Sequence, residues 1–125
     1  MVVKERIDIT QTIQNRGKFD GKIPFITSLI VSSIESKYLK KVYLFGSYAY
    51  GEPNEDSDID ICVIISNDYD DWKAYMDIKT KFWANDIIPC DLIVSTEKMI
   101  DDAIKMNAKC VENTILTEGI VLYGE

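Results

Sequence analysis

The chain has 125 residues, of which 46% are hydrophobic and 28% charged, which is enough for one ordinary domain with one core. It has 21 acidic and 14 basic residues, a formal net charge of -7, and no histidine. So acidic a chain lacks the charge of a duplex DNA or RNA binder, and we expect no direct nucleic-acid binding. Without histidine it cannot form a Ser-His-Asp triad, a Cys-His pair or an imidazole zinc site, which leaves carboxylates, hydroxyls, lysines and thiols for any chemistry.

The beginning of the chain, MVVKERIDITQ, lacks the apolar core of a signal peptide. The longest apolar run, Ile61–Ile65, is far shorter than the roughly 20 residues of a membrane helix. We therefore expect a cytoplasmic protein with no membrane partner. Cys62, Cys90 and Cys110 form no C-x-x-C pair and are odd in number, so reduced, mostly buried thiols are expected.

The first predicted elements follow a polar lead-in, residues 1–22, whose role is left open. From Pro24 to about Lys37, apolar residues three and four apart predict an amphipathic helix. Val42–Phe45 reads as a buried strand that a glycine ends, and Ser47–Gly51 is long enough for one helical turn.

Helices and strands continue to alternate along the rest of the chain. We predict a strand over 59–65, a helix over 70–85, a strand over 87–95, a helical region over 96–117 and a strand over 120–123. Aromatic residues at helical spacing predict an aromatic inner face for the first of these helices, which includes Trp72 and Trp83. Pro89 favours an edge position or a bulge for the third strand. Ser95 or Thr96 is the candidate cap of the helical region, which has a candidate break near Asn107.

This alternation predicts a single α/β (α+β) domain over residues 1–125, with a small mixed sheet flanked by helices. The pattern leaves the strand order open.

Three carboxylates occupy unusual places, because they begin strands that are otherwise almost entirely apolar. Asp58 and Asp60 are two residues apart, so their side chains project to one face of the strand while Ile59 and Ile61 point to the other. Asp91 begins the next strand and can join them if the two strands are neighbours. Such anions repel one another by several kcal/mol, about 4 kcal/mol at 4 Å and an effective dielectric of 20. A hard divalent cation, Mg²⁺ or Mn²⁺, would offset that repulsion.

A second pattern lies just before these acids. Gly46 and Ser47 end a strand and open a short helical turn, where glycine permits close approach and free amides favour a phosphate. Each signal alone is weak, and a structural turn or an exposed strand end would explain it. Together they predict a site for a metal-bound nucleotide.

At these residues the chain resembles the nucleotidyltransferase superfamily that includes DNA polymerase β. Gly46-Ser47, ten intervening residues and Asp58-Ile59-Asp60 match the G-S-x10-D-x-D pattern of its minimal nucleotidyltransferase (MNT) group. The resemblance extends over about residues 23–123 and implies the polymerase β-like fold, with ATP as the substrate. It further implies that Gly46 and Ser47 hold the nucleotide's phosphates.

In the same family, Asp58 and Asp60 would bind Mg²⁺, and Asp91 would be the third carboxylate, as metal ligand or base. Tyr50 and Gly51 fall in the nucleotide-binding turn, where many MNT proteins have Ala-Arg-Gly and this chain has Ala-Tyr-Gly. Tyr50 cannot supply the arginine's charge to a phosphate.

Small MNT proteins of this group pair with HEPN-domain toxins, so the resemblance implies the antitoxin of such a pair, which transfers AMP from ATP to a hydroxyl of its toxin. Two alternatives stay open: an MNT antitoxin that blocks its partner by contact with little catalysis, and an adenylyltransferase with a small-molecule acceptor. The acidic charge favours a basic protein partner, and a second copy of the chain could complete the acceptor surface.

Overall fold

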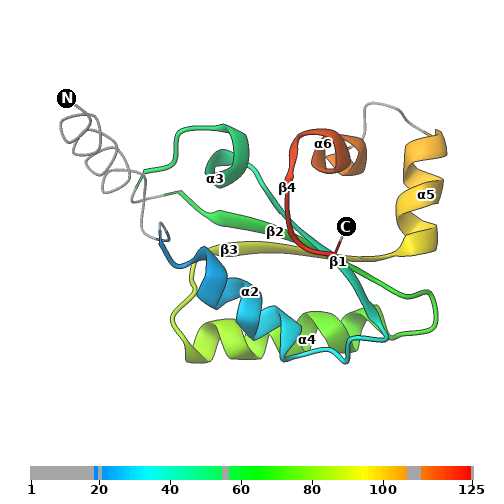
Figure 1. Cartoon of the computed structure of the whole chain (residues 1–125), viewed down its shortest axis with the longest axis horizontal. Coiled ribbons are helices and arrows are strands. Elements are labelled where there is room, and N and C mark those ends of the chain that lie inside the picture. The colour runs from blue at the N-terminus through cyan, green and yellow to red at the C-terminus, as the bar shows by residue number, and fades with distance from the viewer. Residues whose placement is uncertain (1–18, 20, 55–56, 107–110, 125) are drawn as a thin grey trace.

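The computed structural model describes residue 19 and residues 21–54, 57–106 and 111–124 (Figure 1). The helices of this part are α2 (Ile23–Val31), α3 (Ser47–Tyr50), α4 (Asp71–Ala84), α5 (Glu97–Met106) and α6 (Val111–Glu118). The strands are β1 (Leu39–Phe45), β2 (Ile59–Ile65), β3 (Cys90–Thr96) and β4 (Ile120–Tyr123). The predicted alternation of elements is confirmed.

The four strands form one mixed sheet in the order β3-β2-β1-β4. β1 pairs antiparallel with both β2 and β4, whereas β2 and β3 are parallel, with α4 as the crossover between them. The predicted mixed sheet is thus confirmed, and so is the edge position that Pro89 favoured for β3.

Helices cover both faces of the sheet, as Figure 1 shows, with α2 and α4 on one side and α5 and α6 on the other. The α2/α4 face receives the fully buried Ile59, Ile61 and Val63 of β2. The alternate residues of β2, Cys62 and Ile64, join the core beneath α5 and α6. The strand alternation predicted for Asp60 therefore places its carboxylate on the α5/α6 face.

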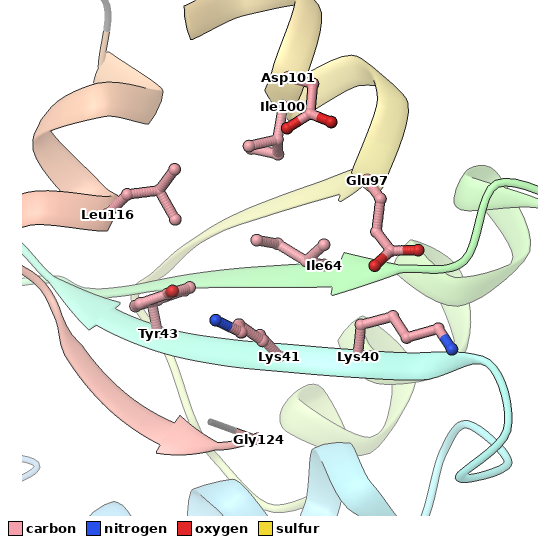
Figure 2. A pocket seen from close by; sticks show the side chains of 9 residues that line it. All are labelled: Lys40, Lys41, Tyr43, Ile64, Glu97, Ile100, Asp101, Leu116 and Gly124. Carbon is pink, nitrogen blue, oxygen red and sulfur yellow. The ribbon is translucent and has the colours of Figure 1, made fainter.

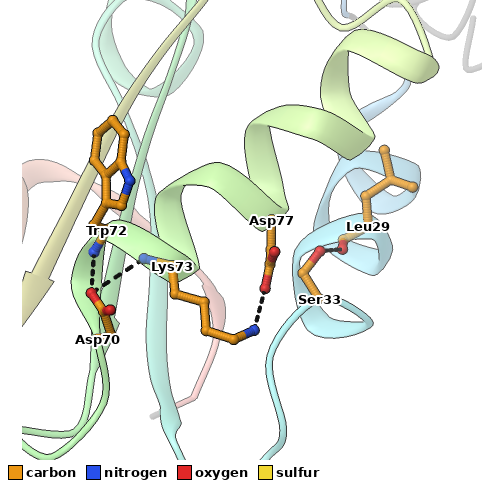
Figure 3. Close-up of polar contacts among 6 residues, drawn as sticks. All are labelled: Leu29, Ser33, Asp70, Trp72, Lys73 and Asp77. Atoms are coloured by element: carbon orange, nitrogen blue, oxygen red, sulfur yellow. Dashed lines mark hydrogen bonds and ion pairs between the residues drawn. The ribbon is translucent and has the colours of Figure 1, made fainter.

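The first helix is shorter than its apolar pattern predicts. α2 ends at Val31 rather than near Lys37. The hydroxyl of Ser33 donates to the carbonyl of Leu29 at 2.7 Å (Figure 3), a local bond that competes with the helical pattern. Ile34 is still buried, so the apolar spacing marks core residues beyond the helix itself.

The expected aromatic inner face of α4 is wrong for its tryptophans. Its buried residues are Ala74, Ile78 and Phe82, four apart, whereas Trp72 and Trp83 are 66% and 56% exposed. A helix turns by about 100° per residue, so positions 72 and 83 cannot share the face of 74, 78 and 82.

Side chains cap the N-terminal ends of α4 and α5. Asp70 caps α4 by accepting from the amides of Trp72 and Lys73, at 3.0 and 3.3 Å (Figure 3). Thr96 accepts from the amide of Met99 at 3.1 Å, which confirms it as a cap of α5. The predicted break near Asn107 lies outside the described residues. No helix of the described part has the length and apolar character needed to cross a membrane.

Candidate functional site

The candidate phosphate-binding turn lies where β1 passes into α3. Gly46 adopts φ 74° and ψ -155°, a conformation that favours glycine, and directly precedes the helical residues Ser47–Tyr50. The amide of Ala49 donates to the carbonyl of Gly46 at 3.0 Å, and that of Gly51 to the carbonyl of Ser47 at 3.1 Å. The short helical turn expected at these residues is confirmed.

Gly51, at the end of the turn, packs closely against Ser47 at its beginning. A Cβ atom at Gly51 would stand 2.9 Å from the Cα of Ser47, so any side chain there would push the turn open. The side chain of Tyr50, the residue in the position of the family's arginine, lies outside the described part of the structure.

The turn is packed directly against one of the predicted metal ligands. Phe45, the residue before the turn, pairs with Asp60 across the β1–β2 ladder. A Cβ atom on Gly46 would overlap the Asp60 carboxylate. The glycine thus lets a carboxylate lie against the backbone that is proposed to hold phosphate.

Asp60 and Asp91 are side by side on neighbouring parallel strands, as the register pairs one with the other. Adjacent strands are about 4.8 Å apart, and Asp58 lies two residues before Asp60. Partial burial, then the charges of Asp91 and Asp58, raise the pKa of Asp60 to about 6. The structure therefore places Asp91 beside Asp60, and Asp58 is near enough for its charge to act on Asp60.

The described residues contain no ready-made cage of three or more acidic, cysteine or histidine ligands for a metal ion. Mg²⁺ is usually bound by one or two carboxylates together with substrate phosphates. Burial and the charges of Asp91 and Asp58 raise the pKa of Asp60, so a nearby cation would favour its ionised form, and the adjoining turn is placed to bring the phosphates. The donor set thus suits a metal that arrives with a nucleotide.

The two described cysteines lie in surroundings that do not favour a reactive thiolate. Cys62 and Cys90 are in the thiol form, and Cys62 is buried. Burial, the largest cause, raises the pKa of Cys90 to about 12, so its thiol stays neutral at physiological pH. Cys110 lies outside the described residues.

The turn is also held by a contact between Tyr48 and Phe19, which the sequence did not predict. Tyr48 of α3 and Phe19 of the lead-in are both buried, with ring centroids 5.9 Å apart at 61°. The amide of Phe19 donates to the Tyr48 hydroxyl at 3.0 Å. The available signal was the single aromatic residue of the lead-in, Phe19. The contact gives this residue a role in holding the turn.

We expect Tyr48→Phe to raise the KM for a nucleotide substrate about three- to tenfold with a smaller change in kcat, because the turn loses one of the contacts that hold it. Loss of one buried hydrogen bond lowers the free energy of unfolding by about 1 kcal/mol. Steady-state kinetics and thermal unfolding measure both, and Tyr123→Phe on β4 is the matched control. An unchanged KM with the expected loss of stability would show that the contact serves the fold alone.

A hollow of about 490 Å³ opens elsewhere on the α5/α6 face (Figure 2). The lining residues are Lys40, Lys41, Tyr43, Ile64, Glu97, Ile100, Asp101, Leu116 and Gly124. It lies at the end of β2 opposite to Asp60 and contains none of the predicted site residues. It is therefore separate from the candidate nucleotide site.

Comparison with known proteins agrees with this geometry. Residues 27–117 match the nucleotidyltransferase domain family. A candidate protein adenylyltransferase of Methanocaldococcus jannaschii is 35% identical over 96 residues, which cover 74% of this chain and 90% of that protein.

Solved structures show the same fold. A toxin–antitoxin complex with AMP-PNP matches with a TM-score of 0.58 and 26% identity, over 82% of this chain and 73% of that one. A candidate nucleotidyltransferase of Sulfolobus solfataricus matches with a TM-score of 0.54 and 20% identity, over 94% and 86% of the two chains. The family match spans most of the chain and includes the turn, the strand pair and the acids, so this protein belongs to the nucleotidyltransferase domain family.

Proposed function

We propose that this protein transfers AMP from ATP to a hydroxyl of a partner protein, with Mg²⁺ or Mn²⁺. The observation that carries this proposal is the contact of the Gly46 turn with Asp60, beside Asp91 in the strand register. It joins the turn that we propose to bind phosphate to a carboxylate pair. The similarity to the candidate protein adenylyltransferase of M. jannaschii supports the reaction class.

In this proposal the turn residues Gly46, Ser47, Tyr50 and Gly51 bind the nucleotide. The metal, when bound by Asp58, Asp60 and Asp91, supplies charge neutralisation at the phosphates. The acceptor oxygen forms a bond to the α-phosphorus, the bond from that phosphorus to the bridging oxygen breaks, and pyrophosphate leaves. Asp91 is exposed at the edge of the sheet, where it can take the acceptor's proton or share the metal.

We propose a HEPN-type toxin as the acceptor and the cytoplasm as the place of reaction. The toxin–antitoxin complex with AMP-PNP supports the kind of partner, since its 26% identity accompanies the same fold. The acidic net charge of -7 suits a basic protein surface.

One observation favours neutralisation by contact alone. Tyr50 replaces the arginine common in the family, which removes a cation from the nucleotide-binding turn. The protein would then bind its partner while transferring little AMP. A small-molecule acceptor is the third alternative, and label transfer separates all three.

The test is incubation of the purified protein with labelled ATP, Mg²⁺ and the product of the neighbouring gene. We expect label on a partner hydroxyl, located by mass spectrometry, and none with the double variant Asp58→Asn, Asp60→Asn. A protein with two exposed carboxylates neutralised, Glu35→Gln and Glu118→Gln, should behave as the parent. A tight complex without label that is unaffected by the double variant would establish contact neutralisation instead. Failure of the parent to bind Mg-ATP would overturn the enzymatic proposal altogether.

A further inference from the structure

The strand that carries Asp91 is held by a neighbour on one side only within the described sheet. β3 is an edge strand, paired with β2 alone. The amide of Ile59 donates to the carbonyl of Pro89 at 3.2 Å, so the Pro89 carbonyl faces β2. Because backbone groups alternate along a strand, the carbonyl of the next residue, Cys90, faces the open edge.

Lys79 of α4 covers that edge carbonyl. Its ammonium donates to the carbonyl oxygen of Cys90 at 2.8 Å and lies 5.9 Å from the ring centroid of Tyr75. A charged donor makes a stronger hydrogen bond than a neutral one, and the ring contact holds the long side chain in place. The beginning of β3 is therefore hydrogen-bonded on both sides, to β2 and to Lys79.

The Cys90 carbonyl that accepts from Lys79 belongs to the peptide unit that also contains the amide of Asp91. Its orientation therefore sets the direction in which the Asp91 side chain leaves the backbone. Cys90 pairs with Ile59 and Asp91 with Asp60, so a shift of this peptide would move one carboxylate relative to the other. Asp91 is exposed, and repulsion from Asp60 favours separation in the absence of a cation.

We propose that Lys79 is a positioning residue of the metal–nucleotide site, which holds the Cys90–Asp91 peptide so that Asp91 stays beside Asp60. Lys79 touches neither carboxylate in this role and acts through the strand. The inference rests on the proposed function for its metal, although the holding of β3 by Lys79 stands on the fold alone.

The simpler alternative is that Lys79 merely attaches α4 to the sheet. α4 offers a matched comparison, because Lys81 also donates one hydrogen bond, to the hydroxyl of Ser32 at 2.8 Å. That bond joins α4 to the end of α2, away from β3. Lys79→Met and Lys81→Met each remove one hydrogen bond of a lysine ammonium and approximately keep the length of the side chain.

The first measurement is the Mg²⁺ concentration that gives half of the thermal stabilisation by AMP-PNP. We expect Lys79→Met to raise it about five- to tenfold, Lys79→Arg to remain within about twofold of the parent, and Lys81→Met to leave it unchanged. Equal values for both Met variants, or no rescue by arginine, would overturn the positioning role.

The second measurement is hydrogen exchange in a peptide spanning residues 88–94 of the metal-free protein. We expect exchange about tenfold faster in Lys79→Met than in Lys81→Met, which would support the holding of β3 even if the parent showed no Mg-AMP-PNP stabilisation at all. That last result would contradict the proposed function rather than the role of Lys79 in the strand. Equal exchange in the two variants would overturn the inference in either case.

Discussion

Asp60→Asn is expected to abolish AMP transfer while it makes the metal-free protein more stable. The loss of activity should be at least about a thousandfold, because the variant removes the carboxylate that lies against the turn and beside Asp91. Label transfer to the partner measures it. A variant with more than a tenth of the parent's activity would show that Asp60 is not a metal ligand.

The gain in stability follows from the raised pKa of Asp60. The usual value for an aspartate is 3.8, and in the fold the pKa is about 6, so the folded state binds the proton more tightly. This stabilisation by the proton is fully present below pH 3.8 and is lost as the pH rises through about 6. At pH 8 the ionised carboxylate therefore destabilises the metal-free parent, and asparagine does not.

We expect Asp60→Asn to raise the free energy of unfolding by about 1 kcal/mol at pH 8, with solvent screening of the half-buried carboxylate taken into account. The midpoint of thermal unfolding should rise by about 4 °C, and the difference should vanish below about pH 4. Glu35→Gln, an exposed carboxylate before β1, is the control and should show no such pH-dependent gain. Equal stability of parent and Asp60→Asn at pH 8 in the presence of EDTA would contradict the electrostatic account.

Most of the fold could be predicted because its elements are local. β2 runs from Ile59 to Ile65 as its β-branched residues predict, and β4 likewise occupies residues 120–123. The strand order could not be predicted, because pairing depends on contacts between distant segments. The exposed tryptophans of α4 are a second case. Helical spacing shows which residues share one face of a helix, but it does not show which face packs against the core.

The candidate site divides in the same way. The spacing of Gly46, Ser47, Asp58 and Asp60 can be read from the sequence, because these residues lie within one short segment of the chain. The pairing of Asp91 with Asp60 was conditional on the two strands being neighbours, which the structure confirms. The contacts of Tyr48 and Lys79 were invisible, because each joins residues brought together only by folding, 29 and 11 positions apart.

Gly46→Ala tests the contact on which the proposed site depends. The substitution adds two costs, a left-handed φ of 74° for a residue with a Cβ atom, and overlap of that atom with the Asp60 carboxylate. We expect a loss of about 3 kcal/mol in the free energy of unfolding, and at least a hundredfold loss of AMP transfer because Asp60 must turn away. Chemical denaturation and label transfer measure the two effects.

Gly21 provides the matched control, because its φ is 82° and a Cβ atom there would meet no atom within 4 Å. Gly21→Ala should therefore lose about 1 kcal/mol from backbone strain and keep full activity. In an Asp60→Ala background the overlap with the carboxylate is removed and only the contact of 3.2 Å with the Cβ of residue 60 remains, so the cost of Gly46→Ala should fall toward that of Gly21→Ala. If Gly46→Ala were no more harmful than Gly21→Ala in the parent, the glycine would serve the turn's backbone alone and the packed carboxylate would not explain its presence. A difference that disappears with Asp60 would instead assign the glycine to the carboxylate, and through it to the metal-bound nucleotide.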